Sequence, residues 1–277
     1  MRISLVLHPF REEASVIARA VCAQAQARGW QVEVAASDSR RVPAADARDG
    51  AFSTDTDLVI GVGGDGTVLE AVRQGLAAAA PVLGVNAGHM GFLTEVEPAR
   101  IGDALEAIDA GDYTISERMT LEADIPGVGT VQGINDAVIE KAISRQVVRV
   151  GVWVGEQRLV EYRCDGIVVA TPTGSTAYNF SAGGPLVDPE LAALVVTPVA
   201  PHNLFGRPIV FGPDTRLRFE VEADRAARIN IDGMALGEIR PGQSVEVRRG
   251  ASQARFLRLT PRNFARSVRD KFHLHDA

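Results

Sequence analysis

Four short apolar runs in the first 112 residues, three of them followed by segments with helical spacing, constrain the fold most. The runs are ISLVL from Ile3, QVEVAA from Gln31, DLVIGV from Asp57 and PVLGVN from Pro81. Continuous apolar strands that alternate with helices are typical of a parallel sheet covered by helices on both faces. Gly29 follows the first helical segment, where a helix C-terminus favours glycine. Residues 1–112 are therefore predicted to form a Rossmann-like α/β domain.

The residue pattern changes after Tyr113, from alternating strands and helices to short strands alone. Many short β-branched runs, among them VVRVGVWV, GIVVAT and RLRFEV, are separated by Gly, Pro, Asn or Asp. Closely spaced strands with turn residues between them indicate an all-β, sandwich-like domain. We assign this β-rich domain to residues 113–250.

Two segments fall outside this pattern. The polar stretch 37–56 has neither strand nor helix periodicity and is expected to be a mobile loop. The C-terminal segment, residues 251–277, is expected to dock back on a domain. This expectation follows from an amphipathic helix near its end, which places four apolar side chains on one face: Phe264, Val268, Phe272 and Leu274.

Charge and cysteine content narrow the function. The net charge of −6 has no basic run or Lys/Arg stripe behind it, which argues against a nucleic-acid groove and favours small-molecule chemistry. Cys22 and Cys164 lie far apart without a C-x-x-C pair, so neither a disulfide scaffold nor a zinc site is expected. No secretion signal and no membrane-spanning run is visible, and the expected location is cytoplasmic.

The loop GVGGDGT, from Gly61 to Thr67, contains a G-x-G-x-x-G pattern with an acid, Asp65, before the last glycine. A dinucleotide fingerprint would follow the first strand and be partnered by an acid at the end of the next strand. This loop follows the third apolar run instead, and the next run ends at Asn86. Asp65 is therefore either a base that takes a proton from a hydroxyl attacking phosphorus, or the N-cap of the following helix; the loop alone does not decide.

A second constellation lies between Tyr162 and Pro189. A strand run ends at Ala170 and is followed by the turn TPTGSTAY and by a glycine pair at Gly183 and Gly184. This run supplies hydroxyls, unhindered backbone N–H groups and one aromatic face within a few residues. Such groups suit the phosphates, ribose and base of a nucleotide.

Six motifs, in their order and spacing, resemble those of bacterial NAD kinases. The resemblance covers residues 58 to 250. GGDGT alone is shared with lipid kinases of the diacylglycerol type and nearly with phosphofructokinases, whereas TPTGSTAY is far more specific. The motifs are GGDGT at Gly63, GVNAGHMGFLTE at Gly84, ND at Asn135, DGIVVATPTGSTAYNFSAGGP at Asp165, TPVAPHNLFGRPIV at Thr197 and DG at Asp232.

The resemblance implies transfer of the γ-phosphoryl group of ATP, or of phosphoryl from polyphosphate, to the 2′-hydroxyl of the adenosine ribose of NAD. It implies that Asp65 is the catalytic base, that Asn135 and Asp136 hold ribose hydroxyls, and that Arg163 and Asp165 flank the nicotinamide side. The implied NAD-binding residues are Asp65, Gly66, Asn135, Asp136, Arg163, Asp165, Thr173, Thr176, Ala177, Tyr178 and Ser181. The implied phosphate loop is Gly63, Gly64, Gly66 and Thr67.

The resemblance also bears on metal and specificity. Asp136 stands where many relatives carry Glu, one methylene longer. Two acids near a triphosphate are tolerable if Mg²⁺ or another divalent cation bridges the oxygens, and Mg²⁺ is expected to arrive with ATP; no protein ligand set is assigned. Relatives with Arg at the position of Arg163 resemble the type that prefers NAD over NADH. His89 lies beside a ligand loop, and His202 is expected to order backbone or a subunit contact.

Two other functions stay open at this point. A lipid or sugar kinase would share GGDGT but would leave the turn after Ala170 unexplained. A non-catalytic NAD-sensing module would bind the dinucleotide without turnover. For the kinase, the partners expected are NAD and ATP or polyphosphate, with no nucleic acid and no membrane. The family also implies a homodimer or homotetramer built through the β-rich domain.

Overall fold

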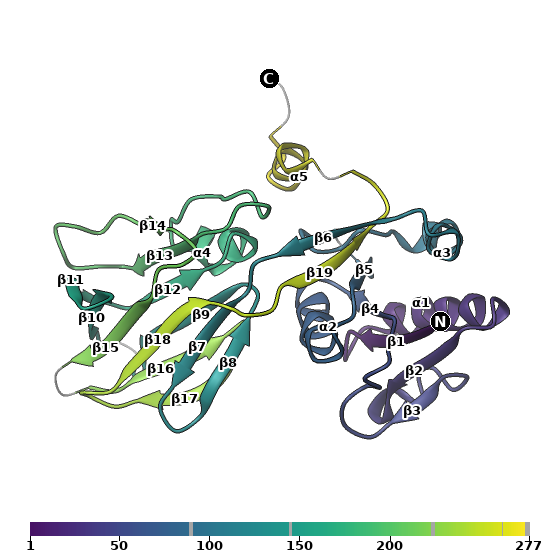
Figure 1. Cartoon of the computed structure of the whole chain (residues 1–277), viewed down its shortest axis with the longest axis horizontal. Helices are drawn as coiled ribbons and strands as arrows, with labels where there is room; N and C mark the ends of the chain where they lie inside the picture. Colours follow the sequence, from purple (N-terminus) through teal and green to yellow (C-terminus); the bar gives the residue numbers. More distant parts are fainter. Residues whose placement is uncertain (89–90, 144–145, 223–224, 262, 275–277) are drawn as a thin grey trace. The chain divides into compact units, whose positions relative to one another are not determined.

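The chain divides into two compact units (Figure 1). The computed structural model describes residues 1–88, 91–143, 146–222, 225–261 and 263–274. The first unit comprises Met1–Glu117 with Ala254–Ala277, and the second comprises Arg118–Gln253. These boundaries fall slightly after the expected ones at 112 and 250, because two strands, Thr114–Arg118 and Ala254–Arg258, belong to the sheet of the first unit. The predicted α/β domain with a β-sandwich domain is confirmed.

A seven-stranded sheet in the order β3-β2-β1-β4-β5-β19-β6 organises the first unit. β1 is parallel to β2 and β4, and β5 is parallel to β4 and β19, as a Rossmann-like sheet requires. The strands are β1 (Arg2–Leu7), β2 (Gln31–Ala35), β3 (Asp46–Arg48), β4 (Leu58–Gly63), β5 (Val82–Asn86), β6 (Thr114–Arg118) and β19 (Ala254–Arg258). The helices are α1 (Glu12–Ala27), α2 (Asp65–Ala78), α3 (Ile101–Ala110) and α5 (Phe264–Lys271), with 3₁₀ turns η1 (Ala36–Asp38) and η2 (Pro98–Arg100).

The strand order reverses at β1, which lies between β2 and β4. In open parallel sheets the carboxyl ends of the strands on either side of such a reversal form the ligand-binding crevice. The segment that follows β4 at this end is the glycine-rich loop. The fold of the first unit therefore puts this loop where sheets of this kind bind ligands.

Different helices cover the two faces of the sheet. Ile60 in β4 belongs to the core that α1 and α3 share with the strands. Gly61, next along β4, faces α2, since a Cβ atom there would lie 3.0 Å from Cβ of Ala71. Successive strand residues point to opposite faces, so α2 lies on the face opposite α1 and α3. The absence of a side chain at Gly61 allows α2 to approach β4 closely.

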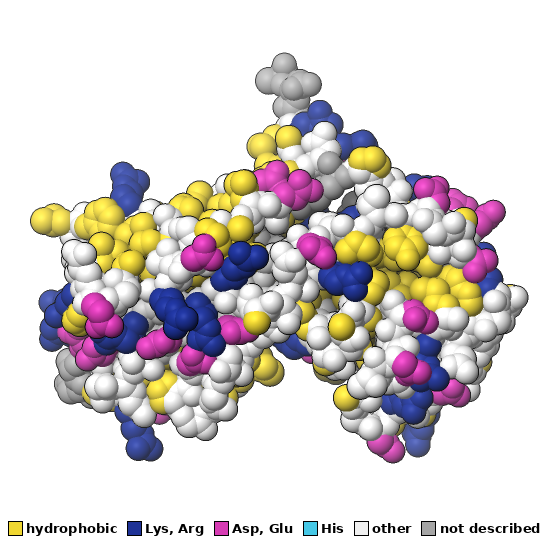
Figure 2. Space-filling model, viewed as in Figure 1, with side chains coloured by type: hydrophobic (Ala, Val, Ile, Leu, Met, Phe, Trp, Pro, Cys, Tyr) yellow, Lys and Arg dark blue, Asp and Glu magenta, His cyan; other side chains and the backbone are white. Residues whose placement is uncertain are grey.

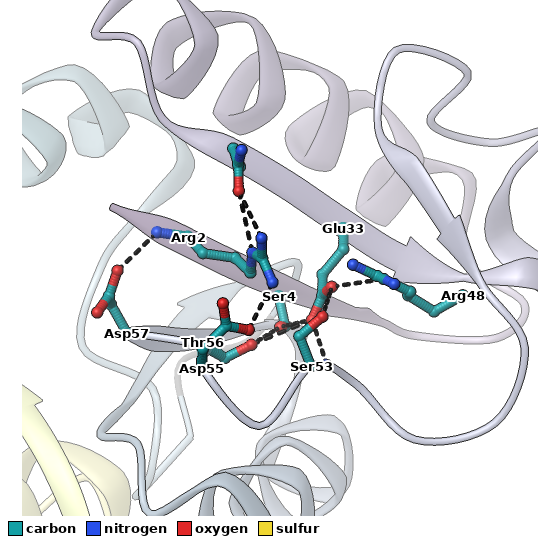
Figure 3. Close-up of polar contacts among 9 residues, drawn as sticks. Arg2, Ser4, Glu33, Arg48, Ser53, Asp55, Thr56 and Asp57 are labelled. Atoms are coloured by element: carbon teal, nitrogen blue, oxygen red, sulfur yellow. Dashed lines mark hydrogen bonds and ion pairs between the residues drawn. The ribbon is translucent and has the colours of Figure 1, made fainter.

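A buried carboxylate anchors the polar stretch that follows β2 (Figure 3). Glu33 is 1% exposed and accepts hydrogen bonds from the side chains of Ser4, Arg48, Ser53 and Thr56, and from the N–H of Ser53. Burial alone would raise the pKa of Glu33, but the hydrogen bonds outweigh it and lower the pKa to about 2. The expectation of a mobile loop over 37–56 is wrong at these positions, because the stretch contains β3 and these anchored donors.

Two six-stranded sheets form the second unit, in the orders β11-β10-β15-β18-β7-β8 and β14-β13-β12-β9-β16-β17. Side chains of both sheets, such as Val150 and Phe219 from one and Ile139 and Ile167 from the other, share one core, as in a β-sandwich. The elements are β7 (Leu121–Ile125), β8 (Gly129–Gly133), β9 (Asp136–Lys141), β10 (Val148–Val154), β11 (Gln157–Cys164), β12 (Gly166–Ala170), η3 (Thr173–Thr176), α4 (Tyr178–Ser181), β13 (Leu194–Val199), β14 (Ile209–Phe211), β15 (Leu217–Glu222), β16 (Ala227–Ile231), β17 (Met234–Ile239) and β18 (Ser244–Arg249). Among the helices described, none is long and apolar enough to cross a membrane.

Candidate active site

The glycine-rich loop of the first unit makes a tight connection from β4 into α2. Gly63 ends β4, and a Cβ atom there would lie 2.2 Å from the hydroxyl oxygen of Thr67. The carbonyl of Gly64 accepts the N–H groups of Thr67 and Val68 and thereby closes the first helical turn. The first N–H groups of a helix have no acceptor within it and carry partial positive charge. The loop therefore offers backbone donors suited to phosphate oxygens.

Asp65 is the first residue of α2, and its carboxylate is held by a different segment. The N–H of Phe92 donates to Oδ2 at 2.9 Å, and the N–H of Leu93 donates to Oδ1 at 2.9 Å. The residue in the N-cap position is Gly64, without a side-chain cap. Asp65 therefore does not cap α2, and the N-cap alternative is wrong. The carboxylate instead has a fixed orientation at the end of β4, with two neutral donors that satisfy its charge.

The segment after β5 completes this end of the sheet. The N–H of Ala87 donates to the carbonyl of Gly63 at 3.1 Å, and Nη1 of Arg11 donates to the carbonyl of Ala87 at 2.8 Å. Nδ2 of Asn86 donates to the carbonyl of Gly88, while its buried Oδ1 has no partner among the described residues. A cleft of about 340 Å³ borders this segment, lined by Arg11, Glu13, Ile17, Ala87, Gly88 and Pro98. The first unit thus places a cation and a cleft beside the segment that joins the acid-bearing loop.

In the second unit, one carboxylate holds the backbone of the predicted Asn135–Asp136 pair. Asp232 accepts the N–H groups of Ile134 at 2.9 Å, Asn135 at 2.7 Å and Asp136 at 3.1 Å. Asp232 and Gly233 have φ values of 48° and 77° and form the two-residue turn between β16 and β17, a conformation for which Asp-Gly is favoured. The hairpin turn therefore fixes the backbone that carries the Asn135 and Asp136 side chains.

The carboxyl of Asp136 is buried, with 5% of the residue exposed. Burial and the nearby negative charge of Asp232 raise the pKa of Asp136 to about 7. The group therefore exchanges its proton near neutral pH. In this range the carboxyl can serve either as a hydrogen-bond donor or as an acceptor.

The turn after β12 packs directly on Asn135. The N–H of Thr171 donates to the carbonyl of Asn135 at 2.9 Å, and a Cβ atom on Gly174 would lie 2.0 Å from the same oxygen. Ser175 is fully buried, where its hydroxyl donates to the carbonyl of Pro172, so its role is structural. Thr173 is 4% exposed, and its buried hydroxyl oxygen has no partner within the described chain. The hydroxyl of Thr173 is therefore a buried polar group without a partner among the described residues.

Tyr178 lies near two of the predicted acidic residues, Asp136 and Asp165. Its side chain is 40% exposed, and its pKa is raised by burial and by the negative charges of Glu140, Asp165 and Asp136. Oδ1 of Asp165 forms a 2.7 Å ion pair with Nζ of Lys141. Asp136, Asp165 and Tyr178 thus belong to one electrostatic neighbourhood beside the turn. The predicted residues Thr176, Ala177 and Ser181 lie in or next to η3 and α4.

Arg163 lies in β11 with an exposed side chain. Its N–H donates to Oδ1 of Asn203, and its carbonyl accepts the N–H of His202. This bond uses only the backbone of His202, so the expected role of the His202 side chain stays a prediction. Among the described residues, no group of three or more His, Cys, Asp or Glu side chains could hold a metal ion.

Both halves of the chain match models of one family. Residues 3–113 match the ATP-NAD kinase N-terminal domain, and residues 134–259 match the ATP-NAD kinase C-terminal domain. The NAD kinase of Carboxydothermus hydrogenoformans is 40% identical over 220 residues, which cover 78% of this chain and 79% of that relative. NAD kinase 1 of Streptomyces avermitilis is 34% identical over 318 residues, covering 100% of this chain and 88% of the relative.

The chain belongs to the NAD kinase family. The predicted resemblance is confirmed, and this member is an enzyme, a phosphotransferase acting on NAD. The lipid or sugar kinase and the NAD-sensing module are not favoured. Two solved structures share the NAD kinase fold. They are yeast NADH kinase in complex with NADH, with TM-score 0.88 and 20% identity over 100% of this chain and 89% of that chain, and an NAD kinase from Archaeoglobus fulgidus in complex with ATP, with TM-score 0.77 and 22% identity over 100% of both chains.

The predicted site residues of this NAD kinase divide between the two units. Gly63, Gly64, Asp65, Gly66 and Thr67 lie in the first unit, and the predicted NAD-binding residues from Asn135 to Ser181 lie in the second. Sequence reasoning gave no role to Asp232, although it quoted the Asp-Gly pair, or to Phe92 and Leu93, which act through backbone N–H groups. His89 lies outside the described residues.

Proposed function

We propose that this NAD kinase transfers the γ-phosphoryl group of ATP, or phosphoryl from polyphosphate, to the 2′-hydroxyl of the adenosine ribose of NAD. A bond forms between the 2′-oxygen and phosphorus, and the bond from that phosphorus to the β–γ bridging oxygen breaks. The hydroxyl proton passes to Asp65. With ATP the products are NADP and ADP, and with polyphosphate they are NADP and a polyphosphate shorter by one phosphate. In-line transfer of this kind needs positioned groups and charge stabilisation more than covalent chemistry from the protein.

The orientation of Asp65 carries this proposal. Its carboxylate lies at the start of α2, beside N–H groups suited to phosphate, and two N–H groups from Phe92 and Leu93 fix its direction. A general base must reach the proton it removes within hydrogen-bond distance. A carboxylate oxygen retains lone pairs after accepting one N–H, so the held carboxylate is still able to accept the ribose proton.

Recognition of NAD is assigned to the second unit. Asn135 and Asp136 hold ribose hydroxyls from a backbone that Asp232 fixes. The turn from Thr173 to Ser181 binds the nucleotide, with the unpaired hydroxyl of Thr173 as one donor. Asp136 is shorter by a methylene than the Glu of many relatives. Its raised pKa allows it to bind a hydroxyl in either protonation state near pH 7.

Mg²⁺ is the proposed metal, bound mainly through the phosphates of the donor. Mg²⁺ keeps several waters and uses one or two carboxylates together with substrate phosphates. The N–H groups at the start of α2 would hold the phosphates that carry the metal, and Asp65 stays free to act as the base. When bound, the metal neutralises charge that develops on the transferred phosphoryl group.

Assembly and location are further parts of the proposal. Leu204, Phe205 and Val210, between β13 and the middle of β14, are exposed by 111%, 49% and 55%, and hydrophobic side chains gather over this part of the second unit (Figure 2). Exposed apolar clusters are typical of interfaces, which supports a homodimer or homotetramer built through this unit. Cys22 and Cys164 are buried free thiols, which supports work in the reducing cytoplasm.

A coupled assay tests the function. The purified chain is incubated with NAD, ATP and Mg²⁺, and NADP is measured with an NADP-specific dehydrogenase. NADP formation that depends on both ATP and a divalent cation is expected. Activity undiminished in excess EDTA would remove the metal from the proposal. Binding of NAD without any NADP would indicate the sensing module, and phosphorylation of a lipid or sugar instead of NAD would indicate the other kinase class.

A further inference from the structure

The segment that holds Asp65 is itself held by the C-terminal end of the chain. Phe92 and Leu93 donate to the Asp65 carboxylate. On one side of this pair, the ring of Phe92 contacts the ring of Phe272, with centroids 6.0 Å apart and planes inclined by 48°. Nζ of Lys271 lies 5.8 Å from the centroid of the same Phe92 ring. Both distances are within the range of favourable aromatic and cation–π contacts.

On the other side of the pair, Glu95 is bound to the residues that end β19 and follow it. Nη1 of Arg258 donates to Oε2 of Glu95 at 2.6 Å, and both side chains are largely buried, at 7% and 12% exposure. The hydroxyl of Thr260 donates to Oε1 at 3.1 Å. Residues 92–95 are therefore held at both ends by the chain between Arg258 and Phe272.

The C-terminal helix α5 is only partly covered. No residue of α5, which is described throughout, is buried, and Phe272 at its C-cap is only half-buried. A helix that contributes no buried side chain adds little to a hydrophobic core. The aromatic contact of Phe272 with Phe92 joins the end of α5 to the segment whose N–H groups hold the Asp65 carboxylate.

We propose that the C-terminal segment from Arg258 to Phe272 is a positioning element for phosphoryl transfer. It fixes residues 92–95 from both sides and so fixes the two N–H groups that orient the Asp65 carboxylate. Phe272 is a positioning residue in this arrangement, since it acts through Phe92. The inference rests on the proposed role of Asp65 as the base, because only then does its orientation control the rate. Small displacements of a catalytic group reduce rates strongly.

Phe272→Ala in the full chain tests the inference, with Leu274→Ala as the matched control. Leu274 is an apolar side chain in the same segment and is 57% exposed. The expected kcat of Phe272→Ala is lower by about fivefold or more, with the KM for ATP and the thermal midpoint close to those of the control. Phe272→Tyr keeps the ring and should restore kcat. Amide hydrogen exchange over residues 91–95 should become faster in Phe272→Ala only.

The exchange measurement separates the positioning role of the C-terminal segment from the proposed role of Asp65 as the base. Unchanged exchange over residues 91–95 in Phe272→Ala would overturn the positioning role, whatever the activity. Faster exchange with a kcat equal to that of Leu274→Ala would overturn it as well, provided that Asp65→Asn is slow. If Asp65→Asn retained full kcat, the proposed function of Asp65 would fail, and the inference about its positioning would fail with it.

Discussion

A Cβ atom on Gly91 would lie 1.8 Å from Oδ1 of Asp65. The N–H of Gly91 donates to the hydroxyl of Thr94 at 2.8 Å, which turns the chain so that the next two N–H groups point at the carboxylate. The close approach of this backbone to Asp65 therefore requires a residue without a side chain. Glycine at position 91 is a condition of the Asp65 geometry and not of the sheet.

Gly91→Ala is expected to displace the Asp65 carboxylate while leaving the fold intact. The clashing atoms are the end of the Asp65 side chain, which moves only by losing its two backbone hydrogen bonds, so a stability cost of about 1 to 3 kcal/mol is expected. A misplaced base should lower kcat by about 10²-fold. Steady-state kinetics and a thermal melt check both parts. Gly102→Ala is the control, because its added Cβ would meet only Oε1 of Gln24, at 3.4 Å. A Gly91→Ala enzyme with normal kcat would contradict the requirement for this geometry.

Asp65→Asn tests the base directly. The amide cannot accept the 2′-hydroxyl proton, and kcat should fall by about 10²- to 10⁴-fold. The amide also presents N–H toward one of the two backbone donors, so a loss of about 1 to 3 kcal/mol in stability is expected. The KM for NAD should change much less, because the ribose contacts assigned to Asn135 and Asp136 remain.

Kinetics at saturating NAD, ATP and Mg²⁺ give the answer for Asp65. Asp103→Asn, on the exposed face of α3, serves as the control for the same substitution. Partial recovery of the Asp65→Asn enzyme at high Mg²⁺ would point to a metal ligand instead of a base. A kcat within about threefold of the parent would exclude proton transfer by Asp65, since general bases contribute at least 10².

Arg163→Gly is expected to relax the preference for NAD over NADH. Resemblance to NAD-preferring relatives carries this expectation, and the side chain is exposed two residues before Asp165. The ratio of kcat/KM for the two dinucleotides is the measurement. Arg163→Lys keeps the charge and separates a charge effect from the shape of the guanidinium. Equal rates with NAD and NADH in the unmodified enzyme would refute the expectation.

The elements that sequence reasoning found are those with strong local patterns. β1, β4 and β5 are buried on both faces and read as continuous apolar runs. β3 and β19 are not predicted, because DAR and ARFLR carry no such run. β19 is defined by pairing with β5 from a distant part of the chain, at Phe256 with Val82. A strand that depends on a non-local partner has little signature in its own residues.

The same reason limits the prediction of the site. Asp65 and the turn after β12 stood out because their residue types suit phosphate and nucleotide chemistry. Asp232 supports Asn135 from 97 residues away, and Phe92 acts on Asp65 through its backbone N–H. A backbone donor can belong to any residue except proline, so no side-chain pattern reveals it. Gly91 and the Asp-Gly turn are the signals that a closer reading could have used.

Glu33 should make the first unit sensitive to acid. Its folded pKa of about 2 lies below the ordinary value of 4.5, so the ionised form stabilises the fold above pH 4.5 by about 3 kcal/mol. This contribution should be lost progressively as the pH falls from about 4.5 toward 2. Glu33→Gln should lower stability at pH 7 and show a weaker fall between pH 5 and pH 3.

Urea unfolding followed by the fluorescence of Trp30, in a Trp153→Phe background, reports on the first unit, where Trp30 is buried. Stability of the parent and of Glu33→Gln is compared at pH 7, 5 and 3. Parallel losses in the two proteins over this range would show that Glu33 is not the source of the acid sensitivity.

Asp136 should have the opposite linkage, and Asp136→Asn tests it. The folded pKa of about 7 lies above the ordinary 3.8, so the folded chain holds a proton that the unfolded chain releases. Stability should therefore fall as the pH rises from about 4 to about 7, by an amount approaching 4 kcal/mol, and then level off. Asparagine carries no charge at any pH in this range. The variant should match the parent near pH 4 and exceed its stability at pH 8, while its affinity for NAD falls.

Asp124→Asn is the control in the same unit. The Arg248 ion pair lowers the pKa of Asp124, so this variant should be slightly less stable than the parent at pH 8. Thermal melts at pH 4, 6 and 8 with NAD titrations distinguish these outcomes. Two outcomes would contradict this prediction: a parent whose stability is constant from pH 4 to pH 8, or an Asp136→Asn variant less stable than the parent at pH 8. Either would mean that burial does not destabilise the ionised form of Asp136. A stabilised variant with weakened NAD binding would show that the second unit gives up stability to keep a carboxyl at the ribose site.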